Sequence, residues 1–201
     1  MADILSRRFA AKSLRLILAS SSSRRRELLS HLGVPFSVWK HSFTEVIDKV
    51  ASPQDMAIEL AACKSDQVAD FLKPGDIVIT ADTIVWCDGR MLNKPGSRDE
   101  AISMLTLLSD KSHEVITGVS IRSHEIINSF ASTTGVRFKA LSAEEIVYYV
   151  DTFSPYDKAG AYGIQEWIGY IGVESISGSY FNVIGLPVQK VYTELIKFTD
   201  Y

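Results

Sequence analysis

The feature that most constrains the fold is the stretch LRLILASSSSRRRELLSHLG, residues 14–33, in which a short apolar run passes through four serines into a helical pattern. Residues 14–19 are typical of a buried β-strand. Leu28, Leu29 and Leu32 recur at the spacing of one helix face, and Gly33 is a typical helix end. The sequence therefore predicts a strand, loop and helix unit, preceded by a loose segment over residues 1–13.

Strand and helix signals follow one another without a strict βαβ alternation. This intermixing predicts an α/β fold in which a mixed β-sheet is flanked by helices. A helix is predicted to begin at Ser52-Pro53-Asp55 and to end at KPGD (73–76), and a strand over 77–86 is followed by a hairpin at Asp88-Gly89. Capping boxes at Ser97/Glu100 and Ser142/Glu145 begin two more helices, with two or three strands as a meander between them, within 113–141. An irregular segment is predicted from Thr152 to Gly185, and a terminal helix from Pro187 to about Phe198.

Composition places the 201 residues among ordinary globular chains, with 46% hydrophobic and 22% charged residues. We expect a single domain over 1–201, because neither a repeat nor a flexible linker interrupts the pattern. No apolar run is long enough for a membrane span, and no secretory signal is recognised, so the expected compartment is the cytoplasm. Cys63 and Cys87 stand far apart and are expected to be reduced.

Three consecutive arginines, Arg24 to Arg26, stand in the first turn of the helix after the serines. Cations there oppose the helix dipole by about 0.3–1 kcal/mol each, a cost that a bound anion removes. Serine hydroxyls and free backbone N–H groups at the same place are typical of a phosphate site. Helical spacing puts Arg24 and Arg25 near the apolar stripe and Arg26 toward solvent. The alternative is a solvated basic turn with serine caps.

Two charged residues break apolar patterns. Lys64 lies on a predicted buried helical row with five apolar residues, Ala57, Leu60, Ala61, Val68 and Phe71. This position predicts either a lysine that snorkels to the surface or a cation directed at an anionic ligand. Asp82 interrupts the most strand-like segment of the chain, where an unpaired carboxylate would cost several kcal/mol. A metal ion, a lysine or an activated water would each compensate it, and hydrogen bonds from a strand end are the alternative.

Two further segments carry weaker signals. Lys94, in NKP, follows the predicted hairpin, so the chain can bring it back toward Asp82. The segment SPYDKAGAYGIQ, residues 154–165, combines charged residues and Gln165 with glycine and alanine, which is typical of a loop that approaches a ligand closely. An ordinary glycine-rich connection is the alternative. The four histidines show no ligand spacing, and no chemistry is assigned to them.

Three separated blocks, LASSSSRRRELLSHLG, ADTIVWCDGRMLNKP and YDKAGAYGIQ with GSYFNVIGLP, resemble the signature motifs of the Maf family in the family's order. The resemblance spans almost the whole chain. It implies two lobes around a deep nucleotide-binding cleft, as in inosine triphosphate pyrophosphatases, a cytoplasmic location and a divalent cation, Mg²⁺ or Mn²⁺. It also implies hydrolysis of a nucleoside triphosphate, with DKAGAYGIQ resembling the subgroup that acts on dTTP and UTP.

The resemblance also implies roles for individual residues. It makes Asp82 the catalytic acidic position and a metal ligand, with Glu45 as a second metal position, and it assigns the other matching residues to substrate binding: Ser20, Arg24, Arg25, Lys64, Thr83, Lys94 and Gln165. Two departures stand out. Ser21 and Ser23 replace the glycine and proline of the usual GSPRR, and Glu166 follows Gln165 where glycine is common, which puts the loop geometry in doubt if that position needs a left-handed backbone.

The expected reaction is metal-assisted cleavage between the α and β phosphates, with the basic residues neutralising the charge that develops on pyrophosphate. Gln165 carries one acceptor and two donors that complement the imide edge of uracil or thymine. A nucleotide-sensing regulator of cell division without turnover remains the alternative. A nucleic-acid binder is disfavoured by the net charge of −3, and the oligomeric state stays open, with a homodimer among the alternatives.

Overall fold

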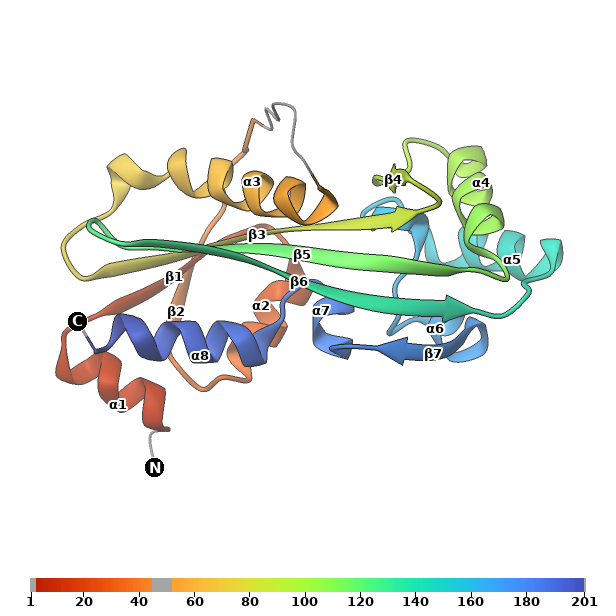
Figure 1. The fold of residues 1–201 in the computed structure, drawn as a ribbon. Helices are drawn as coiled ribbons and strands as arrows, with labels where there is room; N and C mark the ends of the chain where they lie inside the picture. The colour runs from red at the N-terminus through yellow and green to blue at the C-terminus, as the bar shows by residue number, and fades with distance from the viewer. Residues whose placement is uncertain (1–2, 45–51, 201) are drawn as a thin grey trace. The chain divides into compact units, whose positions relative to one another are not determined.

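A computed structural model describes residues 3–44 and 52–200, and seven strands in these ranges form one mixed sheet flanked by helices, as predicted (Figure 1). The sheet order is β2-β1-β3-β5-β6-β7, and β4 pairs with β3 outside this path. The strands are β1 (Arg15–Ala19), β2 (Phe36–Trp39), β3 (Asp76–Cys87), β4 (Arg90–Leu92), β5 (Ser112–Arg122), β6 (Ile127–Phe138) and β7 (Val173–Ser177). The helices are α1 (Ile4–Ala11), α2 (Ser23–Ser30), α3 (Pro53–Asp66), α4 (Arg98–Leu108), α5 (Ala143–Phe153), α6 (Trp167–Gly172), α7 (Tyr180–Ile184) and α8 (Val188–Phe198), with short 3-10 turns at Ala69–Phe71 and Ala159–Ala161.

The chain divides into two compact units. Unit 1 comprises Met1–Asp82, Thr117–Ser132 and Gly185–Tyr201, and unit 2 comprises Thr83–Ile116 and Thr133–Ile184. Strands β3, β5 and β6 each contribute residues to both units.

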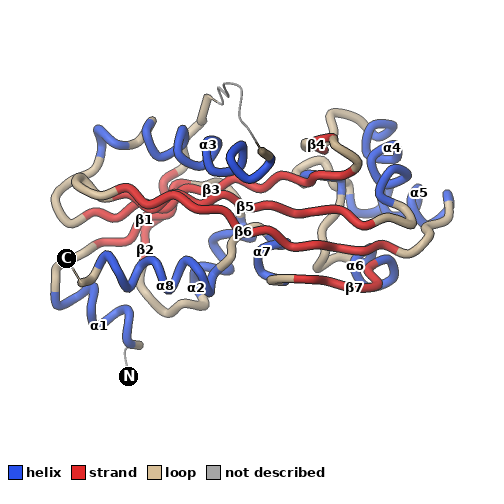
Figure 2. Tube along the Cα trace, in the orientation of Figure 1, coloured by secondary structure: helices blue, strands red, loops and turns tan. Residues whose placement is uncertain are grey.

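Unit 1 is built on three parallel strands with β1 in the middle. The last paired residues are Ala19 with Trp39 of β2 and Leu18 with Ile79 of β3. Helices α3 and α8 cover opposite faces of these strands (Figure 1). Figure 2 shows the same view with helices, strands and loops in different colours. A small apolar core joins β1 and β3 to the segment after α3: Ile17, Ala19, Val68, Leu72 and Val78.

Unit 2 has its own larger core, to which α4, α5 and α6 contribute and in which α4 packs against α5. Strand β3 turns back into the antiparallel β4 at Asp88-Gly89, whose φ angles of 49° and 74° suit a tight hairpin turn, so the predicted hairpin is confirmed.

The two predicted capping boxes differ. Ser142 accepts a hydrogen bond from the Glu145 backbone, and the Glu145 carboxylate accepts one from the Ser142 backbone at 2.8 Å, which completes the box. Ser97 caps α4 in the same way, but the Glu100 carboxylate turns to the N–H of Gly96 at 2.7 Å. Both helix starts are therefore confirmed, but only one of the two reciprocal hydrogen bonds forms in the box at Ser97/Glu100.

The N-terminal segment is not the loose chain predicted for residues 1–13. Residues Ile4–Ala11 form α1, and Asp3 caps it by accepting a hydrogen bond from the Ser6 backbone at 3.0 Å. Leu5 and Phe9, one turn apart, are buried, and α1 contacts α8. A helix this short is stabilised mainly by such packing, which a local sequence pattern does not contain.

The segment from Thr152 to Gly185 is also more regular than predicted. It contains α6, β7 and α7 as well as the turn at Ala159–Ala161. Each of these elements is only three to six residues long, too short to show a helical or strand period.

Among the described residues, no helix combines the length and the apolar character that crossing a membrane requires.

Candidate functional site

The candidate site in unit 1 lies where strand connections leave β1 in two directions. The chain runs from β1 through α2 to β2 on one side, and returns through α3 to β3 on the other side of β1. In parallel sheets such a switch point, at the carboxyl ends of the strands, is the usual place for a ligand. Because Leu18 pairs with Ile79, Ser20 follows β1 at the level of Ala81, next to Asp82.

The serine loop after β1 is tied to the first turn of α2. Ser20 is buried, and its hydroxyl accepts a hydrogen bond from the Ser22 backbone at 3.2 Å. Ser22 is the N-cap and accepts from the Arg25 backbone at 3.3 Å. Helix α2 therefore begins at Ser23, and its dipole and its first N–H groups face the loop. Ser23 stands at the first helical position, where proline is also favoured.

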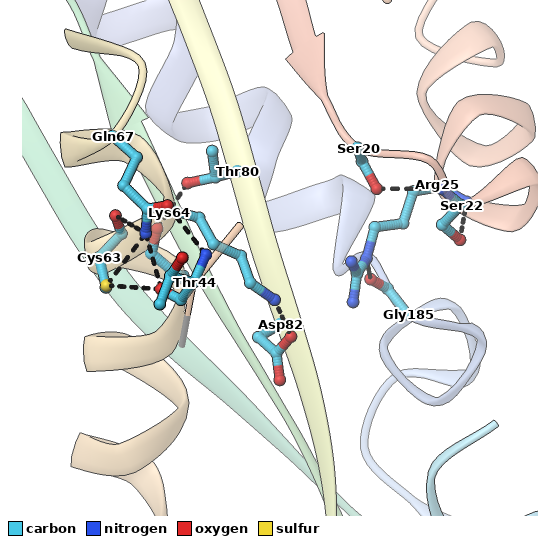
Figure 3. Close-up of polar contacts among 11 residues, drawn as sticks. Ser20, Ser22, Arg25, Thr44, Cys63, Lys64, Gln67, Thr80, Asp82 and Gly185 are labelled. Carbon is cyan, nitrogen blue, oxygen red and sulfur yellow. Dashed lines mark hydrogen bonds and ion pairs between the residues drawn. The ribbon is translucent and has the colours of Figure 1, made fainter. Parts of the chain in front are cut away.

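The arginines of α2 separate as predicted. Arg24 and Arg25 are half-buried, and Arg26 is exposed. The Arg25 Nε donates to the carbonyl of Gly185 at 2.9 Å, which fixes the plane of its guanidinium (Figure 3). Gly185 directly follows α7 and belongs to unit 1.

Lys64 and Asp82 form an ion pair between α3 and β3. The Lys64 Nζ donates to Asp82 Oδ1, and the side chains are only 10% and 19% exposed (Figure 3). The lysine on the buried row of α3 is thus directed at the aspartate in the strand, and each compensates the charge of the other. Asp82 Oδ2 receives no hydrogen bond from the described residues.

Helix α3 is held against the sheet beside this pair. The Thr80 hydroxyl, completely buried, donates to the Ala61 carbonyl at 2.6 Å. At Gly118 of β5 a Cβ atom would lie 1.8 Å from the Ala57 carbonyl oxygen, so the helix backbone rests directly on the strand. Neither Thr80 nor Gly118 stands out in the sequence. Threonine is ordinary in a strand, and the glycine matters only through a helix that lies far away in the sequence.

One described side chain of unit 1, that of Asp82, has the chemistry of a divalent-cation ligand. Asp82 offers a carboxylate oxygen at the switch point, and Mg²⁺ typically binds one or two carboxylates together with substrate phosphates and water. Glu45, the second predicted metal position, lies outside the described residues. Among the residues that are described, no three His, Cys, Asp or Glu side chains gather into a metal-binding group.

The remaining predicted residues belong to unit 2. Thr83 follows Asp82 in β3, so strand alternation places its side chain on the opposite face of the sheet. Lys94 is exposed, after β4. Gln165 is partly buried, and its Oε1 atom is fully buried without a hydrogen-bond partner among the described residues. Such an atom is unusual in a folded protein and calls for an explanation.

Glu166 has an ordinary extended backbone, with φ −97° and ψ 175°, so this position does not require glycine. Its carboxylate accepts a hydrogen bond from Tyr149 and pairs with Lys158 at 3.0 Å. Burial, and then the bond to Glu166, raise the pKa of the Tyr149 hydroxyl above its ordinary value, so Tyr149 stays a donor. The doubt that the sequence raised about this loop's geometry is thereby removed.

Asn182 of α7 is a further residue that the sequence analysis missed. It is completely buried in unit 2, and its amide donates to the Val115 carbonyl at 3.0 Å and to the Thr134 hydroxyl at 2.9 Å. The available signal was an asparagine inside the apolar stretch YFNVIGL.

Comparison with known proteins gives relatives that match most of this chain. A dTTP/UTP pyrophosphatase of Bacteroides thetaiotaomicron is 50% identical over 90% of the chain and 95% of the relative. Proteins of the same name from Phocaeicola vulgatus and Flavobacterium psychrophilum are 48% and 41% identical, over 91% and 92% of the chain and 95% of each relative. The crystal structure of a nucleoside-triphosphatase, or dITP/XTP pyrophosphatase, from Mycobacterium abscessus aligns with a TM-score of 0.42 at 14% identity, covering 90% of this chain and 94% of that one. The family profile described as Maf-like protein matches residues 15–198. The chain therefore belongs to the Maf family.

Proposed function

We propose that this protein hydrolyses dTTP and UTP to the nucleoside monophosphate and pyrophosphate. The observation that carries the proposal is the buried Lys64–Asp82 pair at the switch point, beside the serine loop and the first turn of α2. The names of the relatives, at 41–50% identity over nine-tenths of the chain, support the same reaction.

The proposed reaction places the triphosphate at the loop after β1. Ser20 and the first turn of α2 bind phosphate oxygens, and Arg25, oriented by Gly185, offers its planar guanidinium to them. Arg24 and Lys94 add positive charge. This charge is needed most when the bond between the α-phosphorus and the bridging oxygen breaks and negative charge develops on pyrophosphate.

Asp82 is proposed to orient the attacking water and to accept its proton as the water oxygen bonds to the α-phosphorus. Asp82, with Glu45, is also the proposed holder of a Mg²⁺ or Mn²⁺ ion, which when bound neutralises phosphate charge and polarises the water. Lys64 holds one carboxylate oxygen of Asp82, so the other is left for this chemistry. Lys64 also keeps a cation next to the departing pyrophosphate.

Gln165 is proposed to recognise the base, with Thr83 as a second specificity residue. Uracil and thymine present an N–H between two carbonyl groups, and an amide side chain can accept from that N–H and donate to a carbonyl. The buried Gln165 Oε1, which lacks a partner among the described residues, supports this role because a base N–H would satisfy it.

Two statements about the whole protein are also proposals. One catalytic domain is supported by the family profile, which runs through both units. A cytoplasmic location is supported by the free cysteines Cys63 and Cys87. A homodimer remains a prediction, which light scattering on the purified protein tests.

The test is release of pyrophosphate from UTP, dTTP, CTP, ATP, GTP and ITP, each with Mg²⁺ and with Mn²⁺. We expect turnover of UTP and dTTP above the others and loss of at least about a hundredfold in kcat for Asp82→Asn. Asp70→Asn, at an exposed aspartate in the turn that follows α3, is the control and keeps turnover. Equal rates on purine and pyrimidine nucleotides would refute the proposed specificity. Wild-type turnover by Asp82→Asn would refute the proposed catalytic role of Asp82. Tight binding without pyrophosphate release would favour a nucleotide sensor.

A further inference from the structure

The loop from Asp157 to Glu166 is closed by a buried ion pair between its two ends. Lys158, 9% exposed, donates to Asp157 at 2.7 Å and pairs with Glu166 Oε1 at 3.0 Å. A lysine this deeply buried needs a nearby anion, and Glu166 supplies one from inside the unit. The ends of the loop are therefore held together by charge.

Tyr149 of α5 ties the middle of the loop to the same pair. Its hydroxyl donates to Glu166 Oε2 and accepts from the Gly163 backbone at 3.0 Å. The Glu166 backbone in turn donates to the Gly163 carbonyl at 2.9 Å. A Cβ atom on Gly163 would lie 2.9 Å from Glu166 Cδ and 3.0 Å from Lys158 Cε, so the pair packs against this glycine. Gly163 and Glu166 are thus fixed by the same contacts.

Gln165 stands between these two fixed residues. We infer that Glu166 is a positioning residue, which through Lys158, Tyr149 and Gly163 holds the backbone of Gln165 and so sets where its amide meets the base. The inference rests on the proposed role of Gln165. It adds a specificity determinant at the position where glycine is common in the family. It also gives the buried Lys158–Glu166 pair a role in positioning Gln165.

A held amide and a loose amide select differently between uracil and cytosine. Uracil presents an N–H donor beside a carbonyl, whereas cytosine presents a ring-nitrogen acceptor beside an amino donor. An amide free to rotate can satisfy either pattern by exchanging its oxygen and nitrogen. An amide fixed with its oxygen toward the base N–H satisfies uracil alone, since cytosine would leave a buried group unpaired. Loosening the loop therefore lowers discrimination between UTP and CTP.

The experiment measures the ratio of kcat/KM for UTP to kcat/KM for CTP in wild type, in four single variants and in one double variant of the full chain. The ratio is taken on one preparation, so any unfolded fraction cancels. Glu166→Gln keeps the side-chain shape and removes its charge, and Tyr149→Phe removes the hydroxyl. The matched control is Glu174→Gln, which removes a partly exposed carboxylate from another ion pair of unit 2, with Arg137 at 3.4 Å. Gln165→Ala gives the ratio when the base contact is absent.

We expect the ratio to fall about tenfold in Glu166→Gln and in Tyr149→Phe, the worth of roughly one hydrogen bond, and to stay unchanged in Glu174→Gln. Adding Glu166→Gln to Gln165→Ala should change the ratio no further, because Glu166 acts through Gln165. An unchanged ratio in Glu166→Gln, or an equal fall in the Gln165→Ala background, overturns the inference. Failure of the underlying function looks different: wild type releases no pyrophosphate, or Gln165→Ala leaves the ratio unchanged, and the inference falls with its premise.

Discussion

The direct contact between α3 and β5 at Gly118 makes a single methyl group a sharp probe of the Lys64–Asp82 pair. In Gly118→Ala the new Cβ would lie 1.8 Å from the Ala57 carbonyl oxygen, whereas ordinary contact begins at 3.4 Å, so the helix must withdraw by about 1.6 Å along that line. The same movement would lengthen the 2.6 Å hydrogen bond between Thr80 and Ala61 to about 4.2 Å if it acts along that bond, which breaks it.

The expected cost combines two contributions. Overpacking of a tight site costs about 1–3 kcal/mol, and loss of the Thr80 hydrogen bond costs about 0.5–1.5 kcal/mol. We therefore expect the free energy of unfolding to fall by roughly 1.5–4.5 kcal/mol. Because Lys64 lies on the displaced helix, its contact with Asp82 opens as well. A shift of about 1 Å at a catalytic group can cost about a hundredfold in rate, so kcat/KM for UTP should fall by about that factor.

Urea unfolding and pyrophosphate release together test this reasoning. Gly135→Ala is the matched control, because the Cβ added to this strand glycine would meet its nearest atom only at 3.8 Å. Turnover must be corrected for the folded fraction that urea unfolding gives. If Gly118→Ala unfolds at the same urea concentration as wild type and retains its turnover, the helix does not position Lys64 in the way argued.

Three further predictions concern charge. Arg25→Lys should raise KM for UTP about tenfold in steady-state assays with little change in stability, because lysine cannot contact the Gly185 carbonyl and also present a planar fork to phosphate. Lys64→Met should destabilise the fold by about 3 kcal/mol in urea, whereas Lys64→Met with Asp82→Asn should recover most of that loss without recovering turnover; a stable single variant would contradict the pairing. Burial lowers the pKa of His113 from 6.5 to about 4, so the unfolded chain takes up a proton that the folded chain refuses, and the free energy of unfolding should fall by about 3 kcal/mol from pH 6.5 to 4. In His113→Gln, urea titrations at pH 7, 6 and 5 should show less of this fall, and an identical pH dependence would assign it to other groups.

Local chemistry explains why much of the fold could be predicted. Ser52 accepts from the Asp55 backbone at 3.1 Å, so the start of α3 was encoded within residues 52–55. The strand around Asp82 and the turn at Asp88 were encoded in the same local way. For the site, a lysine on a buried helical row and an aspartate inside a strand were each anomalous enough to be noticed.

The missing information was long-range. The sequence showed that Lys64 and Asp82 each need compensation, but their contact depends on where α3 lies over β3. Helix α7 is set by Asn182, whose amide bonds Val115 and Thr134, residues 67 and 48 positions away. Likewise, Glu166 looked like a departure that endangers its loop, because its partners Tyr149 and Lys158 are visible only once α5 and the loop are in place.

The extended backbone at Glu166 bears on how substrate preference can evolve. A left-handed backbone at this position would restrict it to glycine and a few other residues. The observed φ of −97° is one that most amino acids adopt, so substitutions do not require the backbone to move. Glycine and glutamate are connected by a single nucleotide change in the codon. At this position a lineage can therefore gain or lose an interior charge pair in one mutational step. Under the role proposed for Glu166, the same step would change nucleotide selectivity without rebuilding the loop.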